Sequence, residues 1–255
     1  MLNSDHREGQ IGRPKSLDAY GSRVFQYPAE VKGYFRTRRN VVYAILIIIF
    51  LALPWIKIGG HQAILLDIPG RQFSFFGIHF WAHDAPLIFF IFAFLTLGLA
   101  FVTAIWGRVW CGWACPQTVF IDGIYRRIET WIEGSHLARR KLDLQDWNRE
   151  KILKRSSKWL AFFVVSFLIS HSFLAYFVGS QAIIEYVQHP PSENWTTFLI
   201  VMSFTAFLLF DFGWFREQFC IIMCPYGRFQ SVLMDESSLA IVYDENRVSH
   251  VVVRV

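Results

Sequence analysis

Charged residues are scarce in this sequence: they make up 18% of its 255 residues, against about 25% in an ordinary soluble domain. Aromatic residues are as frequent as charged ones, also at 18%, which excludes a disordered chain because such chains have few of them. Cysteine is rare too, with four residues in all. The formal net charge of +5 alone suggests a nucleic-acid binder, but the positions of the basic residues argue against one.

Four long runs that are almost free of charge explain the low charged fraction. They cover residues 41–56, 86–106, 159–179 and 196–215. About 20 apolar residues are enough for a helix to cross the hydrocarbon core, and a chain in lipid must satisfy its backbone polar groups within each segment. We therefore expect an all-α membrane protein with four transmembrane helices.

The basic residues lie in alternate segments between these runs. Of the 25 Lys and Arg residues, 23 lie in segments 1–40, 107–158 and 216–255. The positive-inside rule places these segments, and with them both termini, in the cytoplasm. The expected partner is the lipid bilayer and not nucleic acid. The expected parts are a cytoplasmic N-terminal segment (1–40), a membrane domain (41–235) and the start of a cytoplasmic domain (236–255).

All four cysteines belong to two similar motifs, each ending in Cys-Pro. Cys220 lies 109 residues after Cys111, and Cys224 lies 109 residues after Cys115. The first two spans and the last two are therefore interpreted as two units that run in the same direction. Such parallel repeats are related by a pseudo-two-fold axis along the membrane normal. We expect two helical hairpins in a parallel repeat, with both cysteine pairs at one level of the membrane.

The Cys-x-x-x-Cys-Pro spacing indicates a thiolate site. Residues four apart share one face of a helix, and proline disfavours helical geometry at the residue before it. Each helix should therefore end at the second cysteine, and Pro116 and Pro225 should begin the next one. A helix N-terminus lowers the pKa of a thiol, and Arg108, Arg216 and Arg228 add positive charge nearby.

The spacing of the four motif cysteines (Cys111, Cys115, Cys220 and Cys224) is compatible with more than one role. Structural disulfides conflict with a reducing cytoplasm. Inert buried cysteines fit poorly with two matched motifs that use every cysteine in the chain. A tetrathiolate site for zinc or copper and an iron–sulfur cluster both fit the motifs. The spacing does not choose between them, because ferredoxin runs use Cys-x-x-Cys instead.

Residues 117–134 show an amphipathic pattern at helical spacing. One face is apolar and the other is mostly charged, carrying Asp122, Arg126, Arg127, Glu129 and Glu133. The pattern predicts an interfacial helix at the inner membrane face, either lying along the membrane surface or packed onto the spans. The basic residues from Arg139 to Lys158 are attributed to contact with lipid headgroups.

Two ionisable residues lie within or beside the apolar runs. Asp211, near the inner end of the fourth run, is the candidate catalytic residue, because an ionisable group in the membrane is costly and functional by default. Its alternative role is a structural ion pair with Arg216 or Arg108. His171 lies in the third run and is suited either to bind metal or haem or to hydrogen-bond within the helix bundle. We favour the structural role for His171.

Three segments carry a resemblance to a known family. They are Trp110-Cys-Gly-Trp-Ala-Cys-Pro-Gln-Thr-Val-Phe120, Asp211-Phe-Gly-Trp-Phe-Arg-Glu-Gln-Phe-Cys220 and Cys224-Pro-Tyr-Gly-Arg-Phe-Gln230. These segments closely resemble the cytochrome c oxidase accessory proteins of the CcoG/FixG/RdxA family, which are membrane polyferredoxins of bacteria. The resemblance extends from about Tyr27 to Arg247.

The resemblance implies a multi-pass protein of the bacterial inner membrane that assists assembly of the cbb-type oxidase by reducing Cu(II) to Cu(I). It implies an iron–sulfur cluster of the 4Fe-4S type, or copper, on the four motif cysteines, with zinc as a further alternative. Implied partners are oxidase subunits, copper-delivery proteins and a ferredoxin or quinol as electron donor. The alternatives are a non-catalytic metal-binding scaffold and a quinol-linked relay to another respiratory reductase.

Members of this family continue into a cytoplasmic domain with two ferredoxin-type cysteine runs. In this chain the family pattern is lost after Arg247, and the only four cysteines belong to the membrane motifs. We therefore expect the chain to stop before that ferredoxin domain.

Overall fold

The computed structural model describes residues 28, 33–58, 61–67, 72–81, 85–106, 109–190 and 194–227. Four helices within these ranges are long and apolar enough to cross a membrane. They are α2 (Tyr34–Ala52), continued by a 3-10 turn (Leu53–Trp55), α3 (Ala85–Trp106), α8 (Arg149–Val178), and α10 (Trp195–Phe210), continued by a π-helical segment (Asp211–Phe215). The prediction of four spans is confirmed, and the protein is a mostly helical, multi-pass membrane protein.

The third spanning helix begins earlier than predicted, at Arg149 and not at residue 159. The side chain of Asn148 caps this end by accepting a hydrogen bond from the backbone N–H of Arg149 at 2.7 Å. Lys151 is buried and donates to the carbonyl oxygen of Asp143 at 3.0 Å. The basic segment before the apolar run is thus helical, since Lys, Glu and Arg are good helix formers that a hydropathy criterion overlooks.

The segment between α2 and α3 contains strands, which corrects the expected all-α class. β1 (Lys57–Ile58) pairs antiparallel with β2 (His61–Gln62), and β3 (Ile64–Asp67), β4 (Gln72–Phe75) and β5 (Ile78–Trp81) form a second antiparallel sheet. The turn between β4 and β5 has positive φ at Phe76 and Gly77, as a tight hairpin turn requires. These strands are two to four residues long, too short to stand out beside long apolar runs.

The side chain of Gln62 fastens this sheet region to the outer end of the third span. It donates from Nε2 to the carbonyl oxygen of Ala175 at 2.9 Å and accepts from the backbone N–H of Ser180, also at 2.9 Å. β3 packs against α8 as well. The small sheets therefore cover the end of α8 that lies opposite the cysteine motifs.

Shorter helices connect these elements. They are α4 (Val109–Trp113), α5 (Pro116–Phe120), α6 (Arg126–Glu133), α7 (His136–Leu144) and α9 (Ser180–Gln188), with π-helical segments at Ile121–Tyr125 and Phe219–Met223. α5, the π-helical segment that follows it, and α6 form one continuous helical stretch. Its bounds, Pro116–Glu133, agree closely with the helix predicted over residues 117–134.

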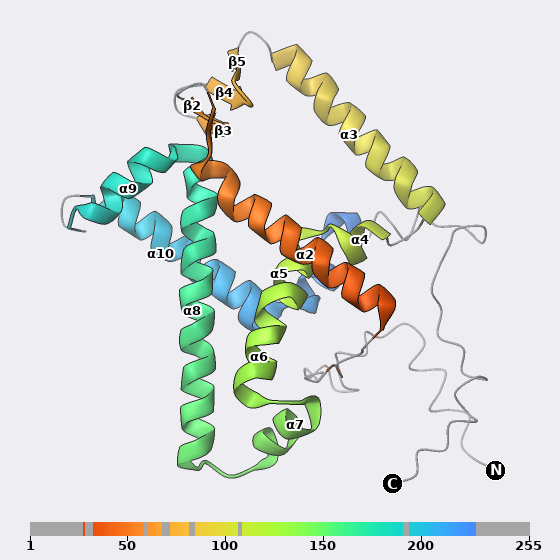
Figure 1. The fold of residues 1–255 in the computed structure, drawn as a ribbon, viewed down its shortest axis with the longest axis vertical. Helices are drawn as coiled ribbons and strands as arrows, with labels where there is room; N and C mark the ends of the chain where they lie inside the picture. Colours follow the sequence, from red (N-terminus) through yellow and green to blue (C-terminus); the bar gives the residue numbers. More distant parts are fainter. Residues whose placement is uncertain are drawn as a thin grey trace.

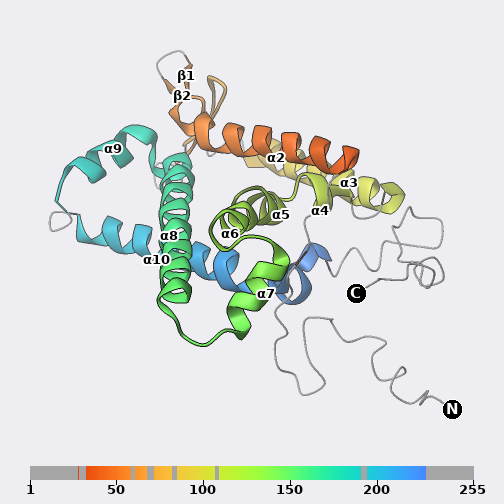
Figure 2. The same cartoon turned by 60° about the horizontal axis from the view of Figure 1, so that its bottom comes forward.

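α8 is the support against which most other elements pack. It contacts α10, α6, α9 and β3, and α10 crosses it in both views (Figures 1 and 2). α3 meets the rest of the protein mainly through α4, and its ribbon stands away from α8 (Figure 1). The third and fourth spans thus pack as a pair. The arrangement of the first two spans as a matching hairpin stays a prediction.

The core lies where the helical stretch Pro116–Glu133 meets α8 and α10. The buried members of this cluster are Phe120, Ile121, Tyr125, Phe162, Ile169, Leu208 and Phe212. The ring of Tyr125 lies 4.9 Å from that of Phe162 and 5.2 Å from that of Phe212, and its hydroxyl lies 2.7 Å from Ser166 Oγ. Aromatic pairs in such geometry add to the free energy gained by burial. This core fixes the helix after the first cysteine motif.

The charged face of the stretch Pro116–Glu133 is buried. Asp122, Glu129 and Glu133 are 6%, 2% and 7% exposed, whereas Trp131 from the apolar face is 94% exposed. A helix lying flat on the membrane surface would expose its charges to water. α6 instead packs against α8, which agrees with the second of the two predicted placements. Basic residues from neighbouring elements compensate the buried carboxylates.

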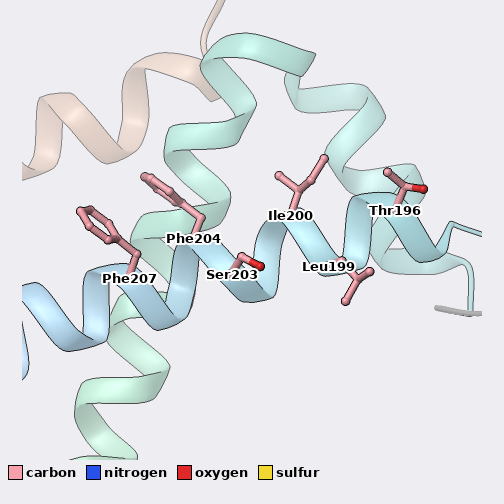
Figure 3. Close-up of a pocket in the computed structure, with 6 residues that line it drawn as sticks. All are labelled: Thr196, Leu199, Ile200, Ser203, Phe204 and Phe207. Atoms are coloured by element: carbon pink, nitrogen blue, oxygen red, sulfur yellow. The ribbon is translucent and has the colours of Figure 1, made fainter.

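A shallow apolar hollow of about 480 Å³ runs along α10. It is lined by Thr196, Leu199, Ile200, Ser203, Phe204 and Phe207, which all belong to this one helix (Figure 3). The lining has no ionisable side chain, so this surface suits contact with lipid chains and offers no group for catalysis. The candidate site is therefore sought at the cysteines.

Candidate metal centre

The first cysteine motif is a helical turn that ends at its second cysteine. Cys111 lies in α4, and the backbone N–H of Cys115 donates to the carbonyl oxygen of Trp110 at 3.0 Å. Cys115 is extended, with φ −61° and ψ 124°, and Pro116 is the first residue of α5. The predicted helix end and the proline helix start are both confirmed, because the proline ring excludes helical geometry at the preceding residue.

The second motif repeats this local geometry. Cys220 lies in the π-helical segment Phe219–Met223, and the backbone N–H of Cys224 donates to the carbonyl oxygen of Phe219 at 2.9 Å. Cys224 is extended, with φ −70° and ψ 111°, and helical backbone resumes at Pro225. In both motifs the second cysteine bonds to the carbonyl five residues before it, so the sequence repeat is also a repeat of backbone structure.

Hydrogen bonds join each motif to the span that precedes the opposite motif. Gln117, which follows the first Cys-Pro pair, donates from Nε2 to Asp211 Oδ1 at 3.0 Å. Tyr226, which follows the second Cys-Pro pair, shares a 2.5 Å hydrogen bond with Oγ1 of Thr103 in α3. The two bonds start from equivalent positions of the repeat and run in opposite directions between its halves. Both motifs are thereby held at the same end of the spans.

The four thiols lie close enough to influence one another's ionisation. Burial, followed by the thiols of Cys115, Cys224 and Cys111, raises the pKa of Cys220 to about 12. Burial also raises the pKa of Tyr226, and the same three thiols add to that shift. Within the described ranges, no three His, Cys, Asp or Glu side chains converge closely enough to surround a single metal ion. The thiols are therefore neighbours that do not point at one centre.

Two close backbone contacts position the motifs. Tyr43 of α2 is fully buried and donates from its hydroxyl to the carbonyl oxygen of Gly112 at 2.6 Å. A Cβ at Gly227 would lie 2.9 Å from the carbonyl oxygen of Cys220 and 3.9 Å from Cβ of Cys224. The first distance is too short for any residue with a side chain, so glycine is required where the chain turns back over the second motif.

The candidate catalytic residue Asp211 is 4% exposed and accepts the hydrogen bond from Gln117. Of its two predicted partners, Arg216 binds Glu129 through both terminal nitrogens, and Arg108 lies outside the described residues. Through Gln117, Asp211 contacts the helix that starts at the first motif. This makes it a positioning residue for that motif.

His171 contacts a residue of its own helix. Its Nδ1 lies 2.8 Å from the carbonyl oxygen of Phe167, and its ring lies 4.1 Å from the ring of Phe167. These contacts support the structural role that the sequence favours for it.

A buried ion network lies between α6, α7 and the end of the fourth span. Oε2 of Glu129 accepts hydrogen bonds from Arg139 and from Arg216, each at 3.1 Å. Next to it, Lys158 pairs with Glu133 at 2.6 Å. The sequence suggests that Arg216 offsets the charge of the thiols, whereas its guanidinium binds Glu129. Glu129 and Glu133 are four residues apart, and that spacing opposite a basic segment was the available signal.

A second group of charges links the first span to the second motif. Asp122 pairs with Arg36 at 3.2 Å, with Arg39 at 3.6 Å and with Arg126. Arg126 also pairs with Glu217, three residues before Cys220. These ion pairs lie at the same end of the molecule as the cysteines.

We expect the ion network to make the protein sensitive to acid. Burial opposes ionisation of Glu129, but the Arg216 hydrogen bond outweighs it and lowers the pKa below the unperturbed 4.5. A lowered pKa stabilises the fold at pH values above 4.5, and this contribution is lost as the pH falls through the folded-state pKa. Unfolding followed by tryptophan fluorescence between pH 7 and pH 3 should show this loss, and it should be smaller in Glu129→Gln.

Family models match two parts of the chain. A 4Fe-4S binding domain matches residues 86–145, and a 4Fe-4S dicluster domain matches residues 215–254. Each range contains one of the two cysteine motifs. Iron–sulfur clusters are therefore the cofactors of this family of sequences.

Curated relatives match almost the whole chain. Protein RdxA and Protein RdxB of Cereibacter sphaeroides are 35% and 33% identical, each over 89% of this chain, and nitrogen fixation protein FixG of Rhizobium meliloti is 34% identical over 97% of it. The chain belongs to the RdxA, RdxB and FixG family of membrane polyferredoxins. The matches cover 49%, 48% and 49% of those relatives, so this polyferredoxin chain spans about half their length. No solved structure matches it.

The family matches correct one expectation. The loss of the family pattern after Arg247 suggests that this polyferredoxin chain stops before any ferredoxin-type segment, but a 4Fe-4S dicluster model matches residues 215–254. Within that range the cysteines are Cys220 and Cys224. The chain is a membrane iron–sulfur protein whose family matches fall on both halves of its repeat.

The contact at Gly227 gives a direct test of the second motif. We expect Gly227→Ala to lower the iron bound per chain at least severalfold, because an added Cβ pushes against the carbonyl of Cys220. Iron and sulfide analysis after anaerobic purification measures the effect. Gly112→Ala is the matched control, since nothing lies within 4 Å of a Cβ at that position. Equal iron loss in both variants would contradict this role for Gly227.

Proposed function

We propose that the four motif cysteines together hold one 4Fe-4S cluster at the cytoplasmic end of the spans. The support comes from the matched motifs: each ends in an extended cysteine before a helix-starting proline. Further support comes from the two hydrogen bonds, Gln117 to Asp211 and Tyr226 to Thr103, that cross between the halves. A pseudo-two-fold relation between two hairpins gives a single reason for both observations.

The donor set fits a multi-iron cluster. Iron–sulfur clusters are held by cysteine thiolates, and in a 4Fe-4S cluster each thiolate binds a different iron. Tetrahedral zinc instead requires all four sulfurs about 2.3 Å from one point. Among the described residues the thiols act on one another electrostatically but do not converge on a single point. This arrangement favours a cluster over a zinc or copper ion held by the same four thiolates.

The proposed orientation places both termini and the cysteine motifs in the cytoplasm of a bacterium. The support is the distribution of Lys and Arg, of which 23 of 25 lie in segments 1–40, 107–158 and 216–255. The buried ion networks of Asp122 and Glu129 lie at the same end as the motifs, which agrees with a basic inner face.

We infer that the chain transfers single electrons, and that its substrate is Cu(II). A bound cluster supplies a one-electron couple. Reduction of Cu(II) to Cu(I) consumes one electron, which a ferredoxin or quinol would provide. The resemblance to oxidase accessory proteins suggests that the Cu(I) goes to copper-delivery proteins and the cbb-type oxidase. In this scheme Tyr43, Gln117 and Tyr226 hold the two motifs in register, and no side chain has to exchange a proton.

Metal analysis and a copper-reduction assay test this proposal. The chain is purified anaerobically in detergent, and iron, sulfide, copper and zinc are measured per chain with EPR spectra. We expect about four iron and four sulfide, and formation of Cu(I), trapped by a chelator, when the reduced protein meets Cu(II). Iron and sulfide without copper reduction would reject the cupric reductase and leave a relay to another reductase. Zinc or copper without sulfide would indicate a metal-binding scaffold.

Asp211 separates a positioning role from a catalytic one. We expect Asp211→Asn to keep both iron and copper reduction, because the amide oxygen still accepts from Gln117. Asp211→Leu should lose iron, since Gln117 then has no acceptor there. Full iron content with abolished copper reduction in Asp211→Asn would restore a catalytic role for this carboxylate.

A further inference from the structure

A cavity of about 370 Å³ lies beside the Glu129 network, between α6, α7, α8 and the end of the fourth span. Its polar lining includes the basic residues Arg139, Arg155, Lys158 and Arg216. It is separate from the four motif cysteines, none of which lines it. Any ligand of this cavity is therefore independent of the proposed electron transfer.

The cavity carries more positive than negative charge. Three carboxylates line it, those of Glu129, Glu133 and Asp143, against four basic side chains. Lys158 pairs with Glu133, and Arg155 pairs with Asp143. Glu129 is shared by two arginines. Within this lining the positive charges therefore exceed the negative charges by one, and a buried charge is stable only when it is compensated.

Arg139 has a donor that the described residues leave unused. The residue is 6% exposed, its Nη1 donates to Glu129 at 3.1 Å, and its Nη2 lies 3.4 Å from the carbonyl oxygen of Pro28. Its Nε is buried and has no hydrogen-bond partner within the described part of the chain. A buried N–H of this kind is costly unless an acceptor reaches it.

Two tryptophans place the cavity at the level of the lipid headgroups. Trp159 and Trp214 line it and are 40% and 47% exposed. Half-exposed tryptophans at the ends of spanning helices mark the membrane–water interface. A ligand can thus enter from the membrane surface as well as from the cytoplasm.

We propose that this cavity binds a phosphate group, with Arg139 as its central ligand. Guanidinium groups bind phosphate oxygens through charge-assisted hydrogen bonds, and one bound anionic charge would balance the excess positive charge of the lining. The headgroup of an anionic phospholipid and inorganic phosphate share this chemistry. The lipid is the source that the flanking tryptophans favour.

Lipid retention measured by native mass spectrometry tests the site. The whole chain is exchanged into micelles that contain equal amounts of phosphatidylglycerol and phosphatidylcholine, and the lipids that stay bound are counted. We expect phosphatidylglycerol to be retained at least fivefold over phosphatidylcholine. Arg139→Gln should remove this preference. Arg140→Gln, which makes the same charge change at an exposed neighbour that does not line the cavity, should keep it.

A second variant covers the case in which Arg139→Gln fails to fold. Glu133→Gln frees Lys158 from its partner and adds one positive charge to the cavity, so retention of phosphatidylglycerol should rise severalfold. Addition of inorganic phosphate identifies the source: competition with the lipid indicates a free phosphate site, and no competition indicates a lipid site. Equal retention of both lipids together with no phosphate effect, or equal loss in Arg139→Gln and Arg140→Gln, would overturn the proposal.

Discussion

Replacing Cys220 by serine is expected to leave the purified chain with less than about a tenth of the iron of the unaltered protein. The reason is that each thiolate of a four-cysteine cluster carries part of the binding energy, and serine is a poor ligand for iron and sulfide. The same loss is expected for Cys111→Ser in the first motif, because both motifs serve one cluster. Iron, acid-labile sulfide and the EPR signal are measured on anaerobically purified protein.

Met223→Ser is the control for this experiment. Met223 lies between Cys220 and Cys224 and is 58% exposed, so the change adds a hydroxyl to the same turn and removes no thiol. We expect it to keep its iron. Helical content measured by circular dichroism should be unchanged in all three variants, since the spans do not depend on the cluster. If Cys220→Ser loses its iron while Cys111→Ser keeps it, the two motifs do not share a cluster.

Replacing Glu129 by glutamine is expected to destabilise the protein by about 3–5 kcal/mol, the usual cost of removing one partner of a buried ion pair. Glu129 is 2% exposed and pairs with both Arg139 and Arg216. Glutamine fills the same volume but leaves two buried guanidinium groups without this counter-charge. The free energy of unfolding in detergent, from denaturant titration, measures the effect.

Glu150→Gln is the matched control. Glu150 is paired with Lys154 at 2.6 Å on the surface of α8, where solvent screens the interaction, and we expect no measurable change. A loss of about 1 kcal/mol or less in Glu129→Gln would show that water already reaches the network. The iron content of Glu129→Gln should stay normal, since Glu129 does not belong to the cysteine motifs.

The parts of the fold that depend on local chemistry are predictable from the sequence. The four apolar runs specify the spans, and the proline after each second cysteine specifies where a helix ends and the next begins. The start of α8 at Arg149 escapes prediction because a helix made of Lys, Arg and Glu has no hydropathy signal. The small sheets escape it because strands of two to four residues carry little pattern of their own.

The contacts that hold the site together are not predictable in this way. Gln117 and Asp211 are 94 residues apart in the chain, and Glu129 and Arg216 are 87 apart. A single sequence shows that such residues are polar but not which ones meet. For the same reason it does not reveal that Arg216 binds Glu129 in place of the thiolates. Only the repeat, with its constant offset of 109 residues, indicates that distant segments converge.

The exchange of hydrogen bonds between the halves also sets an order of events during synthesis. The helix that starts at the first Cys-Pro pair is held by Asp211, a residue made 94 positions later. A nascent chain that has inserted only three spans therefore has one cysteine pair and no partner to steady it. The metal site is completed last, after the fourth span has entered the membrane, and until then its first two thiols depend on the reducing power of the cytoplasm.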